Sequence, residues 1–440
     1  MKIKLHFLVA ILILSHTGKA QQELSLAGAV QKALANNFDI KIAKENYKMA
    51  MISNTQGEAG RFPTINLTGG QNNNISDQSQ NPTSFIQDLL RSNTVNAGAD
   101  LNWVLFNGFR INATKHRLEQ LQYQSAGNEA IVIENTIVAV ILGYYNCKLQ
   151  KDKLDLLRAV LNFSKERYIY NEDRQKMGIS SSFDLLQFKN AVVTDSSALL
   201  MQQIAYINSV RNLNLLMAIN EINTDYIFTD NISVIEEHYL YSDLREKMES
   251  NNQNLKNQYI STEIFKHDVQ LAKATMYPVI SFNAGASCSN AQYKIGDFPQ
   301  IGGTTLNYFA GLSLNFKLYD GGKVRRALQS IKVQEELTTL NIDKLKLELN
   351  GQLTNFYELY EARLKILQLN KEALNLSKQT LDITRDRYNS GLVNSFNVRE
   401  VQMTFLNSGI ATLDATYNLL DTKLQLVKLT GGIVGEYQKE

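Results

Sequence analysis

The sequence predicts a mainly α-helical protein with a small β part, built from two similar halves. Three observations lead to this fold class. Segments recur at a nearly constant spacing, two very long stretches carry a seven-residue apolar repeat, and each half holds one pair of alternating apolar and polar segments. The chain also has only four prolines in 440 residues. Few prolines favour long elements, because proline breaks helix interiors and is confined to the edges and ends of strands.

The duplication is visible as four pairs of matching segments. Asn36-Asn37 recurs as Asn251-Asn252, FPTINLTGG (62–70) as YPVISFNAG (277–285), LNWVLFNG (101–108) as LNFKLYDG (314–321), and RQKMGISSSFDL (174–185) as RYNSGLVNSFNV (387–398). The distance from Gly108 to Gly178 equals that from Gly321 to Gly391, 70 residues. Such self-similarity marks a repeat architecture, and we expect a first repeat over 21–230 and a second over 231–440.

Each repeat is expected to contain the same series of elements. The first repeat should hold a helix over about 24–60, strands over 62–74 and 94–106, a long helix over 110–176, a tip over 177–183 and a return helix to about 220. The second should hold a helix over 241–276, strands over 277–289 and 304–319, a long helix over 323–389, a tip over 390–396 and a return helix to about 429. The segment 221–240 breaks the pattern and is expected to form a small side element.

The strand segments alternate between apolar and polar residues. Leu312, Leu314, Phe316 and Leu318 alternate with polar or amphipathic residues, and 95–105 shows the same pattern. Period two with one apolar face predicts a sheet that is wet on one side only. Four strands cannot close a barrel, and an open sheet edge is not tolerated in lipid. Three copies would supply twelve strands, and the same threefold arrangement would close the helices into a second cylinder.

The two long segments predict helices of about 100 Å at 1.5 Å per residue. Their seven-residue seams indicate coiled-coil-like packing between neighbouring helices. The seams consist of Leu353, Tyr360, Leu367, Leu374, Leu381 and Tyr388 in the second half, and of Val140, Cys147, Leu154, Leu161 and Tyr168 in the first. Cys147 is therefore interpreted as a core residue rather than a reactive thiol. Cys147 in a helix and Cys288 in a strand are expected to lie too far apart for a disulfide.

Composition limits the class of protein further. Residues 1–20 combine basic Lys2 and Lys4, an apolar core and small residues at the end, as in a secretory signal peptide. Removing Lys2, Lys4 and Lys19 changes the formal net charge from +2 to −1, so no charge-driven partner such as nucleic acid is expected. The remaining chain has no uninterrupted run of 18 apolar residues, and we expect no membrane-spanning helix.

These features together resemble the TolC-type outer membrane efflux proteins, also called outer membrane factors. The resemblance rests on the signal peptide, the duplicated plan, the LYDGG segment between strand and helix, and the Gly-x-x-x-Ser-x-[Asp/Asn] hairpins, and it covers nearly the whole mature chain. It implies a homotrimer with one twelve-stranded β-barrel in outer-membrane lipid and a periplasmic α-helical barrel. It also implies a passive export duct that joins a periplasmic adaptor (membrane fusion) protein and an inner-membrane pump of RND or ABC type, in tripartite efflux or type I secretion.

The resemblance places functional residues at the two hairpin tips. Gly178 and Gly391 suit the left-handed position that ends a helix, and Ser182 or Ser395 is placed to cap the next helix. These tips are expected to dock the adaptor. The family's tip aspartate matches Asp184, its tyrosine partner matches Tyr388, and an acid at the tunnel mouth matches Glu400. The family's basic tip residue is replaced by Val393.

Structural explanations compete with a gate role for these residues. Asp184 could serve only as a first-turn acid favoured by the helix dipole. Asn397 and Glu400 fit a capping box, and Tyr388 continues the heptad seam. Trp103 is interpreted as a lipid-facing or interfacial aromatic, with an ordinary packed tryptophan as the alternative.

Gly108, Gly321 and Gly322 are expected to form the bends where a strand passes into a long helix. His116, His238 and His267 are scattered without metal-ligand spacing, no phosphate-binding loop occurs, and no nucleophile–base pair can be argued. We therefore expect no catalytic activity, no metal and no cofactor. The competing hypotheses are a non-pore periplasmic or surface coiled-coil scaffold and, with less support, an exported hydrolase.

Overall fold

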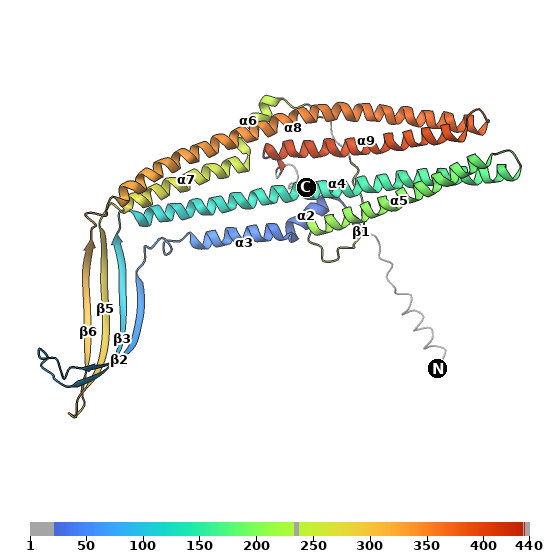
Figure 1. The fold of residues 1–440 in the computed structure, drawn as a ribbon. Coiled ribbons are helices and arrows are strands. Elements are labelled where there is room, and N and C mark those ends of the chain that lie inside the picture. The colour runs from blue at the N-terminus through green and yellow to red at the C-terminus, as the bar shows by residue number, and fades with distance from the viewer. Residues whose placement is uncertain (1–21, 233–236, 434, 436–440) are drawn as a thin grey trace, which may run out of the picture. The chain divides into compact units, whose positions relative to one another are not determined.

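A computed structural model describes residues 22–232, 237–433 and 435, so the expected signal peptide at 1–20 lies outside the described residues. The helices are α2 (Leu26–Asn36), α3 (Phe38–Ser53), α4 (Arg110–Lys176), α5 (Ser182–Leu216), α6 (Tyr241–Asn251), α7 (Gln253–Ala274), α8 (Lys323–Asn389) and α9 (Ser395–Leu429) (Figure 1). The strands are β1 (Gln22–Leu24), β2 (Thr64–Asp77), β3 (Leu89–Phe106), β4 (Tyr226–Phe228), β5 (Val279–Ile295) and β6 (Ile301–Asn315). The chain is mainly helical, as predicted, and α4 and α8 have the expected bounds.

The chain forms two compact units. The helical unit comprises the described residues up to Lys44, Asn128–Lys256 and those from Leu345 onward, and the sheet unit comprises Glu45–Gly127 and Asn257–Lys344. Each of the long helices α4 and α8 contributes to both units.

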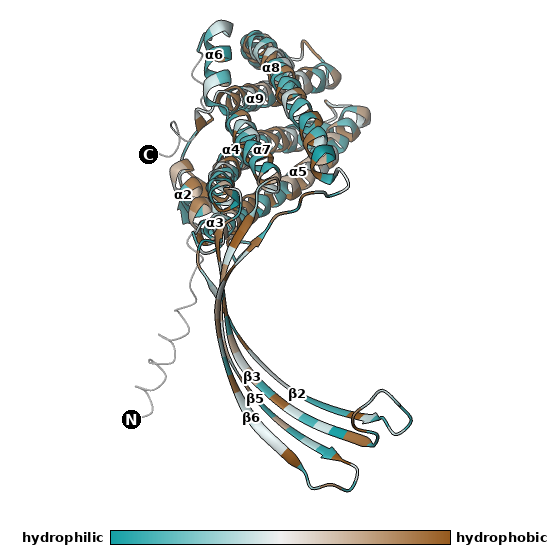
Figure 2. Cartoon of the chain, turned by 90° about the vertical axis from the view of Figure 1, so that its left-hand side faces the viewer, coloured by the Kyte–Doolittle hydropathy of each residue, from teal (hydrophilic) through white to brown (hydrophobic). Residues whose placement is uncertain are grey.

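The sheet unit contains a four-stranded antiparallel sheet with the order β2-β3-β5-β6. The strands lie side by side and curve together (Figure 2). They reach farther toward the loops than predicted, because the ladders continue through polar pairs such as Asn74 with Ser92. At the other end β6 stops at Asn315, not at Tyr319. Asn315 pairs with Val279, the first residue of β5, and Pro278 before it has no N–H to extend the ladder.

Two predicted helices are each broken by a buried asparagine. Asn37 separates α2 from α3, and Asn252 separates α6 from α7. Asn37 Oδ1 accepts from Asp39 N at 2.9 Å while its Nδ2 donates to Leu216 O at 2.9 Å. Asn252 makes the equivalent bonds: its Oδ1 accepts from Leu255 N at 3.1 Å, and its Nδ2 donates to Leu429 O at 3.0 Å. The expected single helices over 24–60 and 241–276 are thus wrong, because each asparagine caps a new helix.

The core of the helical unit confirms the predicted heptad seams. Val140, Cys147 and Tyr144 are fully buried in α4 beside Leu213 and Leu24. A second cluster packs Leu353, Tyr360 and Leu367 of α8 against α6 and α9. Cys147 is a core residue as expected, and both Cys147 and Cys288 are free thiols.

Helix α4 also contains a window long and apolar enough to cross a membrane by length and composition, although polar residues interrupt its apolar run. Ile137, Val140 and Ile141 of this helix lie in the protein core. Packing against other helices accounts for the 44% of that window that is buried, and core helices of this kind pass the same test. The side element expected in 221–240 includes β4, which pairs in parallel with β1, while 233–236 lie outside the described residues.

Candidate hairpin-tip site

Both hairpin tips turn on a glycine in the left-handed conformation. Gly178 has φ +74° and Gly391 has φ +76°. The N–H of Ile179 donates to Arg174 O at 2.9 Å, and the N–H of Leu392 donates to Arg387 O at 2.9 Å. These bonds, from the residue after each glycine back to the last helical turn, close α4 and α8 in the same way.

The helix caps lie one residue earlier than predicted. Ser181, not Ser182, caps α5, and its Oγ accepts from Asp184 N at 3.1 Å. Asn394, not Ser395, caps α9, and its Oδ1 accepts from Asn397 N at 3.0 Å. The capping residue must have extended backbone before the helix starts, and Ser182 and Ser395 are already helical.

This shift also removes the capping-box interpretation of Asn397 and Glu400. Since α9 begins at Ser395, Glu400 lies inside the helix and its side chain is exposed. Ser182 Oγ accepts instead from Gln175 Nε2 at 3.1 Å across its own tip.

Asp184 joins the two hairpins. Its Oδ2 accepts from Ser181 Oγ at 2.6 Å, and its Oδ1 accepts a hydrogen bond from Ser395 Oγ at the start of α9. The hydroxyl of Ser181, and after it that of Ser395, lowers the pKa of Asp184, which keeps this carboxylate ionised. Ser395 is 2% exposed, so a residue expected to cap a helix serves as a buried contact.

Tyr388 is both a core residue and a second link between the hairpins. It packs with Phe188 of α5 and Val398 of α9, beside partly buried Val393. Its hydroxyl donates to Asn171 Oδ1 of α4 at 2.7 Å, and burial raises the pKa of Tyr388. The hydroxyl's hydrogen-bond partner is Asn171 rather than Asp184, so the two predicted gate residues occupy separate links.

A third link was not predicted. Arg399 of α9 binds Asp195 of α5 through two hydrogen bonds of 2.7 and 2.8 Å. Ser164 of α4 donates to Asp195 Oδ2 at 2.6 Å, and Gln402 Nε2 donates to Ser164 Oγ at 2.9 Å. Asp195 is 3% exposed. Its sequence signal is an acid one heptad after the buried Phe188, where an apolar residue is expected.

The strand-to-helix junctions use the predicted glycines. Gly108, Gly321 and Gly322 have φ of +70°, +68° and +79°. Asp320 Oδ1 accepts from Gly322 N at 2.8 Å and Oδ2 from Val324 N at 2.8 Å. The pKa of Asp320 is lowered by hydrogen bonds from backbone N–H groups, of which that of Val324 has the largest effect. Asp320, which precedes the two glycines, therefore caps the start of α8.

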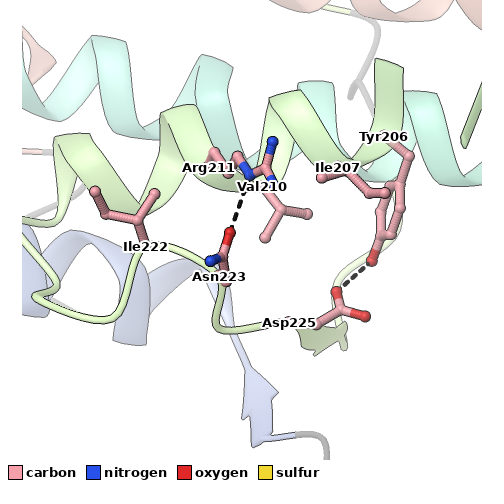
Figure 3. Close-up of a pocket in the computed structure, with 7 residues that line it drawn as sticks. All are labelled: Tyr206, Ile207, Val210, Arg211, Ile222, Asn223 and Asp225. Carbon is pink, nitrogen blue, oxygen red and sulfur yellow. Dashed lines mark hydrogen bonds between the residues drawn. The ribbon is translucent and has the colours of Figure 1, made fainter. Parts of the chain in front are cut away.

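The helical unit has one further feature of chemical interest, a pocket of about 280 Å³ between α5 and the segment that follows it (Figure 3). Its polar groups bind one another, Tyr206 OH to Asp225 Oδ1 at 2.8 Å and Arg211 Nε to Asn223 Oδ1 at 3.0 Å. The pocket thus has paired polar groups rather than a reactive constellation.

The structure brings together two histidines that the sequence left scattered. His116 and His267 stack with ring centroids 5.6 Å apart. Within the described residues no three His, Cys, Asp or Glu side chains form a metal-binding group. The features that stand out are therefore links between hairpins, a bend at each junction and an open sheet.

Comparison with known proteins agrees with these features. The family model described as "Outer membrane efflux protein" matches residues 29–218 and 244–432, one range in each expected repeat. Toxin and drug export protein A of Aggregatibacter actinomycetemcomitans is 20% identical over 419 residues, covering 92% of this chain and 86% of that protein. The solvent efflux pump outer membrane protein SrpC of Pseudomonas putida is 21% identical over 412 residues, covering 93% of this chain and 85% of that protein.

Solved structures show the same fold. The Campylobacter jejuni CmeC outer membrane channel superposes with a TM-score of 0.76 at 15% identity, covering 92% of this chain and 85% of that one. The open state of the Neisseria gonorrhoeae MtrE outer membrane channel superposes with a TM-score of 0.70 at 15% identity, covering 93% of this chain and 89% of that one. Because the family model matches most of both halves of the chain, this protein belongs to the outer membrane efflux protein family.

Proposed function

We propose that three copies of this outer membrane efflux protein close one twelve-stranded barrel in the outer membrane, continued by a helical barrel in the periplasm. The observation that carries this is the open sheet: in the described part of the chain β2 and β6 each pair along one side only. A membrane sheet with open edges leaves backbone groups unsatisfied in lipid. Pairing β6 of one copy with β2 of the next removes both edges.

Exposed apolar seams on two helices support the same assembly. Val193, Leu200 and Ile207 repeat every seven residues on α5 and are 62, 60 and 45% exposed. Leu369, Leu376 and Ile383 repeat likewise on α8 and are 65, 55 and 55% exposed. A second heptad seam that a single copy leaves exposed fits packing against a neighbouring helix, and a neighbouring copy provides one.

The duct would act as a passive conduit that joins a periplasmic adaptor and an inner-membrane pump of RND or ABC type. Equivalent apolar residues stand exposed at both tips, Ile179 with Leu392 and Phe183 with Phe396, each 61–75% exposed. Exposed apolar groups at equivalent places fit a docking surface. Drugs, toxins and solvents are the cargo named for the similar export proteins, and we propose small toxic molecules as the cargo here.

The tip residues would form the gate. Asp184 and Tyr388 hold the two hairpins of one copy together, and we assign them to keeping the tunnel mouth closed. Glu400 has an exposed side chain on α9 and would contribute a carboxylate to the mouth. Gly178, Ser182, Gly391 and Ser395 would shape the tips that meet the adaptor.

The assembly is tested by disulfide cross-linking in a background with Cys147→Ala and Cys288→Ala. One cysteine replaces Thr68 on β2, and a second is placed in turn at Gly303, Thr305, Asn307 and Phe309 on β6. Within one copy β3 and β5 separate these strands by about 14 Å, beyond the roughly 7 Å limit for a disulfide. Covalent dimers and trimers are expected at one or two positions, together with single-channel conductance in a bilayer. A non-conducting monomer at every position would favour the scaffold hypothesis.

A further inference from the structure

One face of the four-stranded sheet carries a continuous apolar band. Residues directly opposite on neighbouring strands share a face, so Leu67, Ala99, Ala286 and Tyr308 form one row across the sheet. The adjacent rows on this face are Ile65, Leu101, Ala284 and Ala310, and then Trp103, Phe282 and Leu312. The opposite face has polar pairs, such as Asn102 with Asn283 joined at 2.6 Å.

The band changes to polar and then to basic residues toward the loops. Asn93 lies opposite Gln292, and two residues farther Arg91 lies opposite Lys294. Both basic residues are exposed and stand on the same face as the apolar band. The sequences of β2, β3, β5 and β6 contain no other lysine or arginine. Two bases 203 residues apart in the chain thus meet at one position of the sheet.

Like charges directly opposite in an antiparallel pair destabilise it, so this pair needs a compensating anion. Neither Arg91 nor Lys294 forms an ion pair there. The acid on the same face is Asp77, opposite Leu89, and its Oδ1 accepts from Ser79 N at 3.0 Å in its own turn. The two positive charges are therefore open to an external anion.

The surroundings of the basic pair suit a phosphate group. A cavity of about 400 Å³ is lined by the basic pair, by five amide residues and by three others: Asn73, Asn74, Asn93, Gln292 and Gln300, with Ile75, Ser92 and Tyr293. Gln300 Nε2 donates to Gln292 Oε1 at 2.8 Å, and Gln71 Nε2 donates to Asn93 Oδ1 at 3.2 Å. These bonds hold Asn93, Gln292 and Gln300 in place, and Lys and Arg form charge-assisted hydrogen bonds with phosphate oxygens.

We propose that Arg91 and Lys294 bind the phosphate head group of an anionic lipid in the outer leaflet, with the acyl chains lying on the apolar band. This inference rests on the proposed barrel, in which the apolar face meets lipid. The strand ends that join α4, α7 and α8 face the periplasmic helices, so the loop ends of the strands reach the opposite, outer leaflet. A basic pair at the loop-side border of an apolar band is placed at head-group depth.

The test measures lipid binding to the delipidated protein and its variants in a neutral detergent. Native mass spectrometry detects the bound lipid. The probes are diphosphoryl lipid A, zwitterionic phosphatidylcholine and inorganic phosphate. The variant Arg91→Gln with Lys294→Gln is matched with Lys41→Gln plus Lys44→Gln, which removes the same charge from exposed positions of α3. We expect the affinity for lipid A to fall roughly thirtyfold in the sheet variant, since each base near an anionic lipid surface contributes about 1 kcal/mol, and to stay unchanged in the control.

Three results would overturn the lipid site: equal affinity in the sheet variant, an equal loss in the control, or equal binding of phosphatidylcholine. Displacement of lipid A by millimolar inorganic phosphate would assign the pair to free anions instead. Conductance and oligomeric state are measured on the same samples. If the protein forms conducting trimers whose lipid affinity is unchanged by both substitutions, the lipid site is refuted and the duct is not. Non-conducting monomers would refute the duct.

Discussion

Asp195 is a charged side chain at a core position. The fold tolerates it there because hydrogen bonds satisfy both of its carboxylate oxygens. Arg399 supplies two hydrogen bonds and Ser164 a third, so the carboxylate oxygens are satisfied at 3% residue exposure. A buried ion pair is weak support for stability when both partners are present, but removing one partner leaves an uncompensated charge. The network is better understood as fixing which faces of α4, α5 and α9 meet.

We predict that Arg399→Met destabilises the protein by about 3 kcal/mol, because Asp195 is left buried without its cation. Adding Asp195→Leu to it restores a large part of this loss, since no charge then remains buried. Guanidinium unfolding followed by circular dichroism measures both. The control is Arg158→Met, which breaks an exposed pair with Asp155 at 3.0 Å and is expected to cost under about 1 kcal/mol. A double variant less stable than the single one would contradict this account.

Glu134 is a second buried acid, 5% exposed in α4, and it predicts a pH dependence. Burial raises its pKa, with Lys428 and Lys256 opposing this in part. A carboxyl whose folded pKa exceeds its unfolded value stabilises the fold below the unfolded pKa, and this contribution is lost as pH rises through the folded pKa. Glu134→Gln should therefore raise the melting temperature relative to wild type more at pH 7 than at pH 4. An equal difference at both pH values would show that Glu134 ionises in the fold as it does in water.

At the scale of elements, Gly108 and Gly321, one from each strand-to-helix junction, share a conformation but not an environment. A Cβ on Gly108 would lie 2.5 Å from Ala274 O and 2.7 Å from Tyr277 Cβ, whereas one on Gly321 would meet nothing within 4 Å. Both have positive φ, which costs alanine about 1 kcal/mol. The first junction is thus closely packed and the second is open.

We predict that Gly321→Ala costs about 1 kcal/mol, and that Gly108→Ala costs about 2 kcal/mol more because overpacking adds to the backbone strain. The yield of assembled protein in isolated membranes and its melting temperature in detergent check the order. Gly351→Ala inside α8, where a Cβ also meets nothing within 4 Å, is the control and should be neutral or stabilising. Equal losses at Gly108 and Gly321 would show that strain alone decides.

The same elements show how far sequence reasoning reaches. Both long helices and both tip glycines were predicted because heptad spacing and the left-handed conformation are local properties. The breaks at Asn37 and Asn252 were not predicted, although the repeated asparagines were visible. Their capping depends on burial against the distant carbonyls of Leu216 and Leu429. The link from Asp195 to Arg399, and the pairing of Arg91 with Lys294, likewise need segments over 200 residues apart to meet.

At the scale of the whole molecule, the proposed duct would open at its closed end by separating the hairpins, and two of the hydrogen bonds between them near the tips would resist this. Asp184 with Ser395 and Tyr388 with Asn171 each connect one hairpin to the other. Both links join α4 or α5 to α8 or α9 near the tips. If the closed mouth depends on them, their removal shifts the equilibrium toward the open state without changing the path through the barrel.

We predict that Asp184→Ala combined with Tyr388→Phe raises the open-state population in single-channel recordings roughly thirtyfold, since two such hydrogen bonds together contribute about 2 kcal/mol. The matched control is Asp173→Ala with Tyr170→Phe, which removes the same two groups but breaks only contacts within α4, to Lys176 and Arg174. Ser395→Ala should reproduce part of the effect, because it removes the partner of Asp184 in the other hairpin and leaves the acid in place. Unchanged recordings for the double variant, or an equal increase in the control, would reduce Asp184 to a first-turn acid and Tyr388 to a core side chain.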